Sequence, residues 1–202
     1  MYTLRMSPAS PYARKVRMAI TAFGLQDQIT MQTTDTNDLG DSLQSQNPLG
    51  RIPVLITPQG LCVYDSRVIL DHLERLAGQA LFPASGAARD AALTRAALAE
   101  GLIDSAIAWV YAERFAGDQP PSTVWRERQQ HKIKQALNHL EADIATWPEP
   151  SEGLGAPIAL ACALGYISFR AIHPWSEGRP QLTTWYQQVA STLPGFAATE
   201  PA

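Results

Sequence analysis

The chain has 202 residues, of which 46% are hydrophobic and 17% charged, and its formal net charge is −3. This length and composition allow a sizeable core in one large domain or two small ones, and they exclude a disordered chain. The cationic residues are scattered, apart from a cluster at Arg14, Lys15 and Arg17. We therefore expect neither nucleic acid nor a membrane as a partner, and we interpret the cluster as a solvated helix face.

The first residues contain Arg5 and are followed by prolines, so they lack the apolar core of a signal peptide, and no later run reaches membrane-spanning length. The sequence therefore predicts a cytoplasmic protein. Cys62 and Cys162 lie in apolar segments without C-x-x-C spacing, and we interpret both as buried packing residues. The histidines show no metal-type spacing, so no metal site is expected.

Before Pro83, strand-like patterns alternate with helical ones. Tyr2, Leu4 and Met6 alternate with polar residues, as in a strand with one buried face. The expected elements are, in chain order, a strand at 2–6, a helix closed by Gly24, a strand at 29–32, a loop with one helical turn at 33–46, a hairpin of strands at 53–56 and 62–64, and a helix closed by Gly78.

After Pro83 the strand patterns disappear. Helices are expected at 87–115, at 124–147, at 157–169, where nearly every side is apolar, and after Pro180. The fold class is thus α/β followed by all-α, with domains at residues 1–80 and 86–202. The stretch 154–157, which precedes the apolar helix, contains neither a capping side chain nor an acid, so a weak helix start is expected there.

Candidate chemistry begins at Ser10-Pro11, where the first strand leads into the first helix. Serine is a preferred N-cap and proline a preferred first helical residue, so Ser10 is expected beside free N–H groups and the positive end of the helix dipole. A simple cap explains the pair equally well when it is considered alone. The neighbouring segments of the domain favour a functional site.

Two further segments could hold a peptide-like ligand. Pro53 precedes an apolar strand, and a cis peptide there would turn the chain and leave the backbone of Ile52 exposed for strand-like pairing. Asp65 and Ser66 lie between a strand and a helix. Ser66 could cap that helix, its N-terminal N–H groups could bind a carboxylate, and Asp65 could hold an ammonium group. Helix capping alone is the alternative for this pair.

Together these segments resemble the glutathione S-transferase family, and the resemblance extends over essentially the whole chain. It is closest to bacterial members with Ser-Pro-Phe/Tyr at the active-site turn. The matching stretches are SPASPYARKVRMAI at 7–20, NPLGRIPVL at 47–55, YDSRVIL at 64–70 and IALACALGYISFR at 158–170.

The resemblance implies a thioredoxin-like N-terminal domain, an α-helical bundle, a homodimer, and glutathione as substrate or cofactor. Ser10 matches the residue whose hydroxyl donates to the glutathione sulfur. Ile52, before a cis proline, matches the residue whose backbone pairs with the cysteinyl part of the tripeptide. The remaining glutathione-binding positions implied are Pro53, the pair Asp65 and Ser66 at the γ-glutamyl end, and Arg51, where relatives often have Lys or Gln.

An electrophile pocket is expected between the two domains, lined partly by the helix that ends near Phe115. Trp109, Tyr111 and Arg114 are the candidates for its wall. Aromatic residues at helical spacing also pack in cores and in dimer interfaces, and that alternative stays open for all three.

Three functions agree with the sequence. The first is conjugation of glutathione to a small hydrophobic electrophile through a thiolate stabilised by Ser10, as in detoxification. The second is glutathione-dependent isomerisation of the maleylacetoacetate type, whose basic active-site pattern Lys15-Val16-Arg17 matches only loosely. The third is a non-catalytic protein that binds glutathione or another ligand, or that regulates a partner. Because residue 10 is serine and not cysteine, mixed-disulfide chemistry is disfavoured.

Overall fold

The computed structural model describes residues 1–38, 40–118 and 122–202. Two compact units account for the described chain, the first formed by 1–81 with 194–202 and the second by 82–193. We expected 194–202 in the helical domain, whereas in the structure this segment belongs to the first unit. The fold class is the expected one, a thioredoxin-like α/β unit and an all-helical unit.

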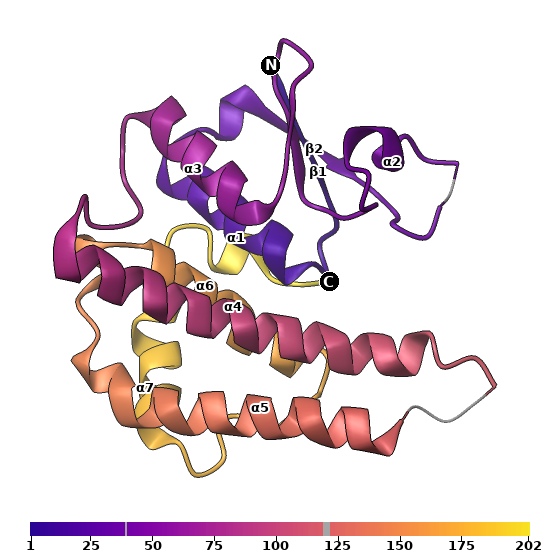
Figure 1. Ribbon diagram of the computed structural model, residues 1–202. Helices are drawn as coiled ribbons and strands as arrows, with labels where there is room; N and C mark the ends of the chain where they lie inside the picture. The colour runs from indigo at the N-terminus through magenta and orange to yellow at the C-terminus, as the bar shows by residue number, and fades with distance from the viewer. Residues whose placement is uncertain (39, 119–121) are drawn as a thin grey trace. The chain divides into compact units, whose positions relative to one another are not determined.

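A four-stranded mixed sheet of order β2-β1-β3-β4 forms the centre of the first unit. Strand β1 is parallel to β2 and antiparallel to β3, and β4 is antiparallel to β3. Figure 1 shows α1 and α3 on one side of this sheet and α2 on the other. The elements are β1 (Tyr2–Met6), α1 (Pro11–Ala22), β2 (Ile29–Thr33), α2 (Leu43–Gln46), β3 (Val54–Ile56), β4 (Cys62–Val63) and α3 (Ser66–Ala77).

The boundaries of these elements follow local chemistry. Ser10 caps α1, and Pro11 is its first residue, where a missing N–H costs no helical bond. Gly78 ends α3 in the left-handed region at φ 64°, which glycine adopts without strain. The hairpin of β3 and β4 is confirmed. In β1, however, Arg5 is as buried as Leu4 and Met6, so the strand is covered on both faces rather than alternating.

The basic cluster on α1 is not the solvated face that we expected. Arg14 and Lys15 are only 2% and 1% exposed, and the C-terminal segment contacts Arg14. Arg14 donates to the carbonyl oxygen of Phe196 at 2.9 Å and lies over its ring, 5.0 Å from the centroid. Arg17 donates to the carbonyl oxygen of Ala198 at 3.3 Å. The segment that follows the helical unit is therefore anchored by α1.

The second unit consists of helices, with α6 buried among the others along nearly its whole length. Two short 3-10 turns lie between α5 and α6, and two more follow α7. The helices are α4 (Gly86–Arg114), α5 (Thr123–Asp143), α6 (Gly155–Phe169) and α7 (Pro180–Gln188), and the short turns among the described residues of the chain are at Gln26–Gln28, Ile144–Thr146, Pro150–Glu152, Ala190–Thr192 and Ala197–Thr199.

Helix α6 begins without a side-chain cap, as the sequence predicts. Its first residue, Gly155, lies directly against the ring of Phe82: a Cβ atom added at Gly155 would be 2.2 Å from the Cζ atom of Phe82. The aromatic ring thus covers the uncapped helix start. The start of α6 thus has apolar packing from Phe82 but no capping hydrogen bond from a side chain.

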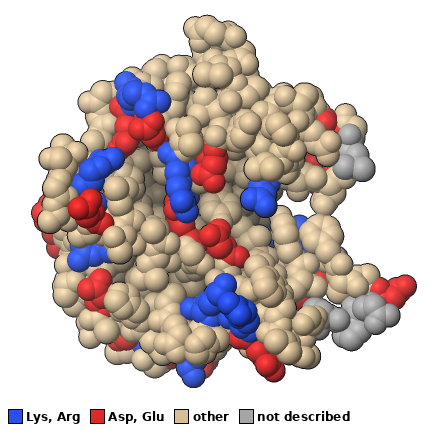
Figure 2. All heavy atoms as spheres, in the orientation of Figure 1, with Lys and Arg blue, Asp and Glu red and all other residues tan. Residues whose placement is uncertain are grey.

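The surface is mixed in charge. On the face shown in Figure 2, the described cationic and anionic side chains are interspersed. In the described part of the chain, no helix is both long enough and apolar enough to cross a membrane. Of the two cysteines, Cys162 is buried as predicted, while Cys62 is half-buried, and both are free thiols.

Candidate functional site

Ser10 follows the carboxyl end of β1 and is the N-cap of α1. Its Oγ accepts a hydrogen bond from the N–H of Ala13 at 3.2 Å. A hydroxyl group has one proton to donate and can accept two bonds, so this capping bond leaves the Ser10 proton for another acceptor. The positive end of the α1 dipole lies at the same place, which favours a negatively charged partner there.

The turn before β3 has the geometry that the sequence analysis expected. The Ile52–Pro53 peptide bond is cis, Pro53 is buried, and Arg51 is exposed. The antiparallel ladder between β1 and β3 begins with the pair Arg5 and Val54, so Ile52 precedes it and its backbone groups are not used in that ladder. The carbonyl oxygen of Arg51 accepts a hydrogen bond from Nδ2 of Asn47 at 2.8 Å.

At the start of α3, the structure corrects one assignment. The cap is Asp65, whose Oδ1 accepts the N–H of Arg67 at 2.8 Å, and Ser66 is the first residue of the helix. An aspartate carboxylate reaches the N–H two residues later, so it performs the capping that we assigned to the serine. Ser66 is 3% exposed and Asp65 is exposed, and the Tyr64–Asp65 peptide bond is cis.

The sheet register brings these three segments to one edge. Arg5, near the carboxyl end of β1, is paired with Val54 at the amino end of β3. Leu55 of β3 is paired with Val63 at the carboxyl end of β4. Ser10, which follows β1, Ile52, which precedes β3, and Asp65, which follows β4, therefore lie at the same edge of the sheet. This edge offers a hydroxyl donor, a free strand-like backbone and two helix N-termini.

Known proteins resemble this chain in sequence and in structure. The glutathione S-transferase N-terminal domain matches residues 9–76. The chain is 31% identical over 199 residues to the uncharacterized GST-like protein YibF of Escherichia coli strain K12. This alignment covers 96% of each of the two chains. The chain belongs to the glutathione S-transferase family.

Solved structures of other members of the glutathione S-transferase family resemble the whole chain. A family member from Pseudomonas fluorescens Pf-5 with bound glutathione is 37% identical and has a TM-score of 0.88, with all of both chains covered. A glutathione S-transferase from Methylobacillus flagellatus KT with glutathione bound is 31% identical and has a TM-score of 0.89, again with all of both chains covered.

In the helical unit, the three residues that the sequence suggests for an electrophile pocket do not form one cluster. The ring of Trp109 is covered by Arg126 of α5, whose guanidinium carbon is 4.1 Å from the ring centroid. Tyr111 is 42% exposed, lies edge-on to Phe115, and has the guanidinium of Arg114 5.4 Å from its ring centroid. Tyr111 and Arg114 thus stay together, while Trp109 packs against α5.

A buried phenol on α6 joins Tyr111 and Arg114, and sequence reasoning did not single it out. Burial raises the pKa of Tyr166. Three effects act in the opposite direction: the charge of Arg170, the hydrogen bond between Tyr166 and Arg170, and the charge of Arg114. Arg170 lies over the ring of Phe169 at 4.5 Å. The C-terminal ends of α4 and α6 therefore present two guanidinium groups beside phenol rings. Tyr166 and Arg170 lie in the stretch 158–170 that resembles the family, but no feature of the sequence places them near Tyr111 and Arg114.

A cavity of about 300 Å³ lies elsewhere in the helical unit. Its lining includes Ala88, Arg95, Trp147 and Pro157, and the three residues proposed for the electrophile pocket are not among the described residues that line it. Arg95 faces Asp143 at 3.7 Å and Trp147 donates to the same carboxylate at 2.9 Å. Arg95 and Trp147 of the lining are therefore both engaged with Asp143.

Proposed function

We propose that the protein is a glutathione transferase, in which Ser10 stabilises the thiolate of bound glutathione for attack on an electrophilic small molecule. The observation that carries the proposal is the convergence of Ser10, Ile52 and Asp65 on one edge of the sheet. The binding of glutathione by relatives that match the whole chain supports it.

In the proposed complex, the backbone of Ile52 pairs with the cysteinyl residue of glutathione. The N-terminal N–H groups of α3 and the hydroxyl of Ser66 donate hydrogen bonds to its γ-glutamyl carboxylate, Asp65 binds the ammonium group, and Arg51 lies near the tripeptide. The Ser10 hydroxyl donates to the sulfur. Lowering the pKa of a thiol by two units takes about 2.7 kcal/mol of preferential stabilisation of the thiolate. One charge-assisted hydrogen bond and a helix dipole together reach that range.

The thiolate then attacks the electrophilic carbon. A carbon–sulfur bond forms with the sulfur electron pair, and either a leaving group departs with its bonding electrons or a conjugated double bond accepts them and takes a proton from water. No general base is required, because the thiol proton is lost before the attack.

For the electrophile we propose Tyr111 and Arg114, with Trp109 retained as a weaker candidate because Arg126 covers its ring. A relative from Pseudomonas fluorescens Pf-5, 36% identical, binds S-(propanoic acid)-glutathione, an adduct that carries a carboxylate beyond the sulfur. Arg114 and Arg170 would complement such a carboxylate here. We therefore propose electrophiles that combine an apolar body with an acid group.

Mass spectrometry of the reaction products tests the proposal. The protein is incubated with glutathione and a panel of electrophiles, each offered as the carboxylic acid and as its methyl ester. We expect the glutathione adduct, with kcat/KM lowered about 10- to 100-fold in Ser10→Ala, the range of one hydrogen bond to a charged group. The matched control is Ser122→Ala, which removes the serine cap of α5. Arg114→Met should reduce the preference for acids over esters.

The same assay separates the alternatives. An isomer formed without net consumption of glutathione would indicate the isomerase, and glutathione binding without turnover of any substrate would indicate a non-catalytic protein. Either result would contradict conjugation as the function.

We further propose that the protein acts as a cytoplasmic homodimer in the detoxification of electrophiles. The exposed apolar side chains of Leu61 and Val68 in the first unit support self-association. The two free thiols fit a reducing compartment. Light scattering at micromolar concentration should give the mass of two chains, and a monomer at all concentrations would contradict the dimer.

A further inference from the structure

One of the most buried charges in the first unit belongs to a residue outside the proposed site. Arg5 lies in the middle of the sheet on β1 and is 1% exposed. Removing a guanidinium from water is costly unless its N–H groups are all hydrogen-bonded and its charge is paired. The partners of Arg5 therefore show what its burial accomplishes.

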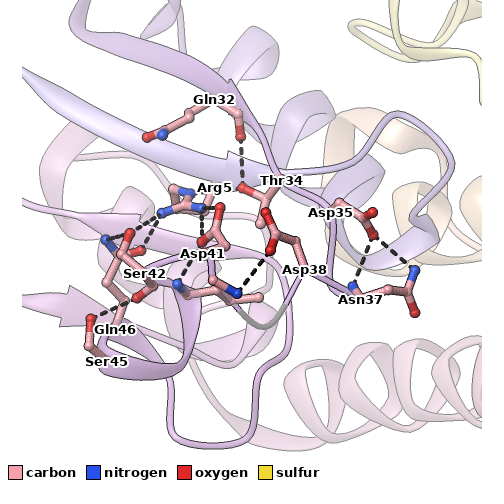
Figure 3. Close-up of polar contacts among 12 residues, drawn as sticks. Arg5, Gln32, Thr34, Asp35, Asn37, Asp38, Asp41, Ser42, Ser45 and Gln46 are labelled. Carbon is pink, nitrogen blue, oxygen red and sulfur yellow. Dashed lines mark hydrogen bonds and ion pairs between the residues drawn. The ribbon is translucent and has the colours of Figure 1, made fainter.

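Those partners all come from one segment beyond β2. Nε of Arg5 donates to Oγ1 of Thr34 at 2.8 Å, and Nη2 donates to both carboxylate oxygens of Asp41, at 2.5 and 2.7 Å. Nη1 donates to Oγ of Ser42 at 3.1 Å and to Oε1 of Gln46 at 2.8 Å. Figure 3 shows the guanidinium of Arg5 with Thr34, Asp41, Ser42 and Gln46 grouped around it.

These bonds fix α2, a helix too short to be stable alone. Asp41, held by Arg5, accepts the N–H of Leu43, the first residue of α2, at 2.6 Å, and Ser42 between them is the N-cap residue. Gln46 is its last residue. Arg5 therefore holds both ends of this helix against the sheet.

The residue after α2 holds the proposed glutathione turn. Asn47 is 3% exposed, and its Nδ2 donates to the carbonyl oxygen of Arg51 at 2.8 Å. Its Oδ1 accepts the N–H of Leu49 at 3.1 Å. At the other end of the turn, Val54 is paired with Arg5 itself in the sheet. Arg5 thus fixes residues 47–53 at both ends: its side chain holds Gln46 before the turn, and its backbone pairs with Val54 after it.

We propose that Arg5 is a positioning residue for glutathione, which holds α2 and Asn47 so that the backbone of Ile52 is presented to the tripeptide. This inference rests on the proposed function, because it assigns Ile52 to glutathione binding. Arg5 touches neither the ligand nor Ser10 in this role. Its loss should weaken glutathione binding more than it changes the chemical step.

Isothermal titration with glutathione, steady-state kinetics and hydrogen exchange test the proposal in the full-length protein. In Arg5→Lys, one ammonium cannot replace a planar group that engages Thr34, Asp41, Ser42 and Gln46 together. We expect Kd and KM for glutathione to rise about tenfold, with kcat within about twofold of wild type. Amides in 47–52 should exchange faster. If Arg5→Lys fails to fold, Asp41→Asn at a partly exposed site takes its place in the test and should show the same pattern more weakly.

The matched control is Arg75→Met, which removes the guanidinium of an exposed pair with Asp71 on α3 and should leave all readouts unchanged. A folded Arg5→Lys or Asp41→Asn with wild-type Kd, KM and exchange would overturn the positioning role while leaving the proposed function in place. Absence of glutathione binding in the wild-type protein would overturn the proposed function, and the positioning role with it.

Discussion

Ser10 illustrates how one hydroxyl group can serve both folding and chemistry. As an acceptor it caps α1 through Ala13, and as a donor it remains available to a sulfur atom. These roles do not compete, so a residue typical of an ordinary cap is compatible with a catalytic function. Sequence reasoning identifies the position from the Ser-Pro pair, whereas the second role depends on what the sheet brings beside it.

Arg5 shows the opposite case, in which the local pattern misleads. Its place between Leu4 and Met6 predicts the solvent-facing side of an alternating strand, yet it is buried. The reason is non-local: Asp41 and Gln46, far along the chain, provide its hydrogen bonds. A strand pattern contains no information about such partners, so the network could not be predicted from the sequence.

The pair of Arg5 and Asp41 predicts a specific pH dependence of stability. Hydrogen bonds from Arg5 hold the pKa of the Asp41 carboxyl below its usual value. A carboxyl with a lowered pKa in the folded state stabilises the protein above its unfolded pKa of about 3.9, and this contribution disappears as the pH falls through the folded pKa. The difference in free energy of unfolding between wild type and Asp41→Asn should therefore be present at pH 6 and shrink below about pH 4.

Urea unfolding at a series of pH values measures this difference. Asp71→Asn is the control, because Asp71 is 61% exposed in its pair with Arg75 and should contribute little at any pH. A wild-type advantage over Asp41→Asn that stays constant down to pH 3 would contradict the assignment.

Among the elements, the start of α6 compensates for poor local sequence by packing. The sequence correctly predicts the missing cap, but it gives no sign that Phe82, far earlier in the chain, covers Gly155. Most helix boundaries were predictable because Gly, Pro and Ser residues define them locally. The partner of an uncapped helix end depends on tertiary structure.

Gly155→Ala should therefore destabilise the protein, although alanine is the better helix former. The added methyl group would displace the ring of Phe82, and overpacking of this kind costs about 1–3 kcal/mol. Gly101→Ala on α4 is the matched control: nothing lies within 4 Å of its added Cβ, so it should stabilise by up to about 1 kcal/mol. Urea unfolding measures both. An equal increase in the free energy of unfolding of the two variants would show that Phe82 does not restrict Gly155.

For the whole molecule, the order of the elements and the change from α/β to all-α near Pro83 were predictable, since hydrophobic periodicity changes there. The last residues were not: 194–202 return to the first unit, where Phe196 meets Arg14. Aliphatic residues in a short tail fit either unit equally well by pattern. The proposed glutathione site could be outlined from the family motifs, whereas Tyr111 and Arg114, which we propose for the electrophile, lie outside those motifs.

The most direct test of the account is the pH titration of thiolate absorbance for glutathione bound to wild type, Ser10→Ala and Ser122→Ala. We expect the bound thiol in wild type and Ser122→Ala to ionise about two pH units below free glutathione, a shift that Ser10→Ala largely loses. A bound thiol that titrates like free glutathione in wild type, or equally low in Ser10→Ala, would contradict the central claim that the Ser10 hydroxyl stabilises the thiolate.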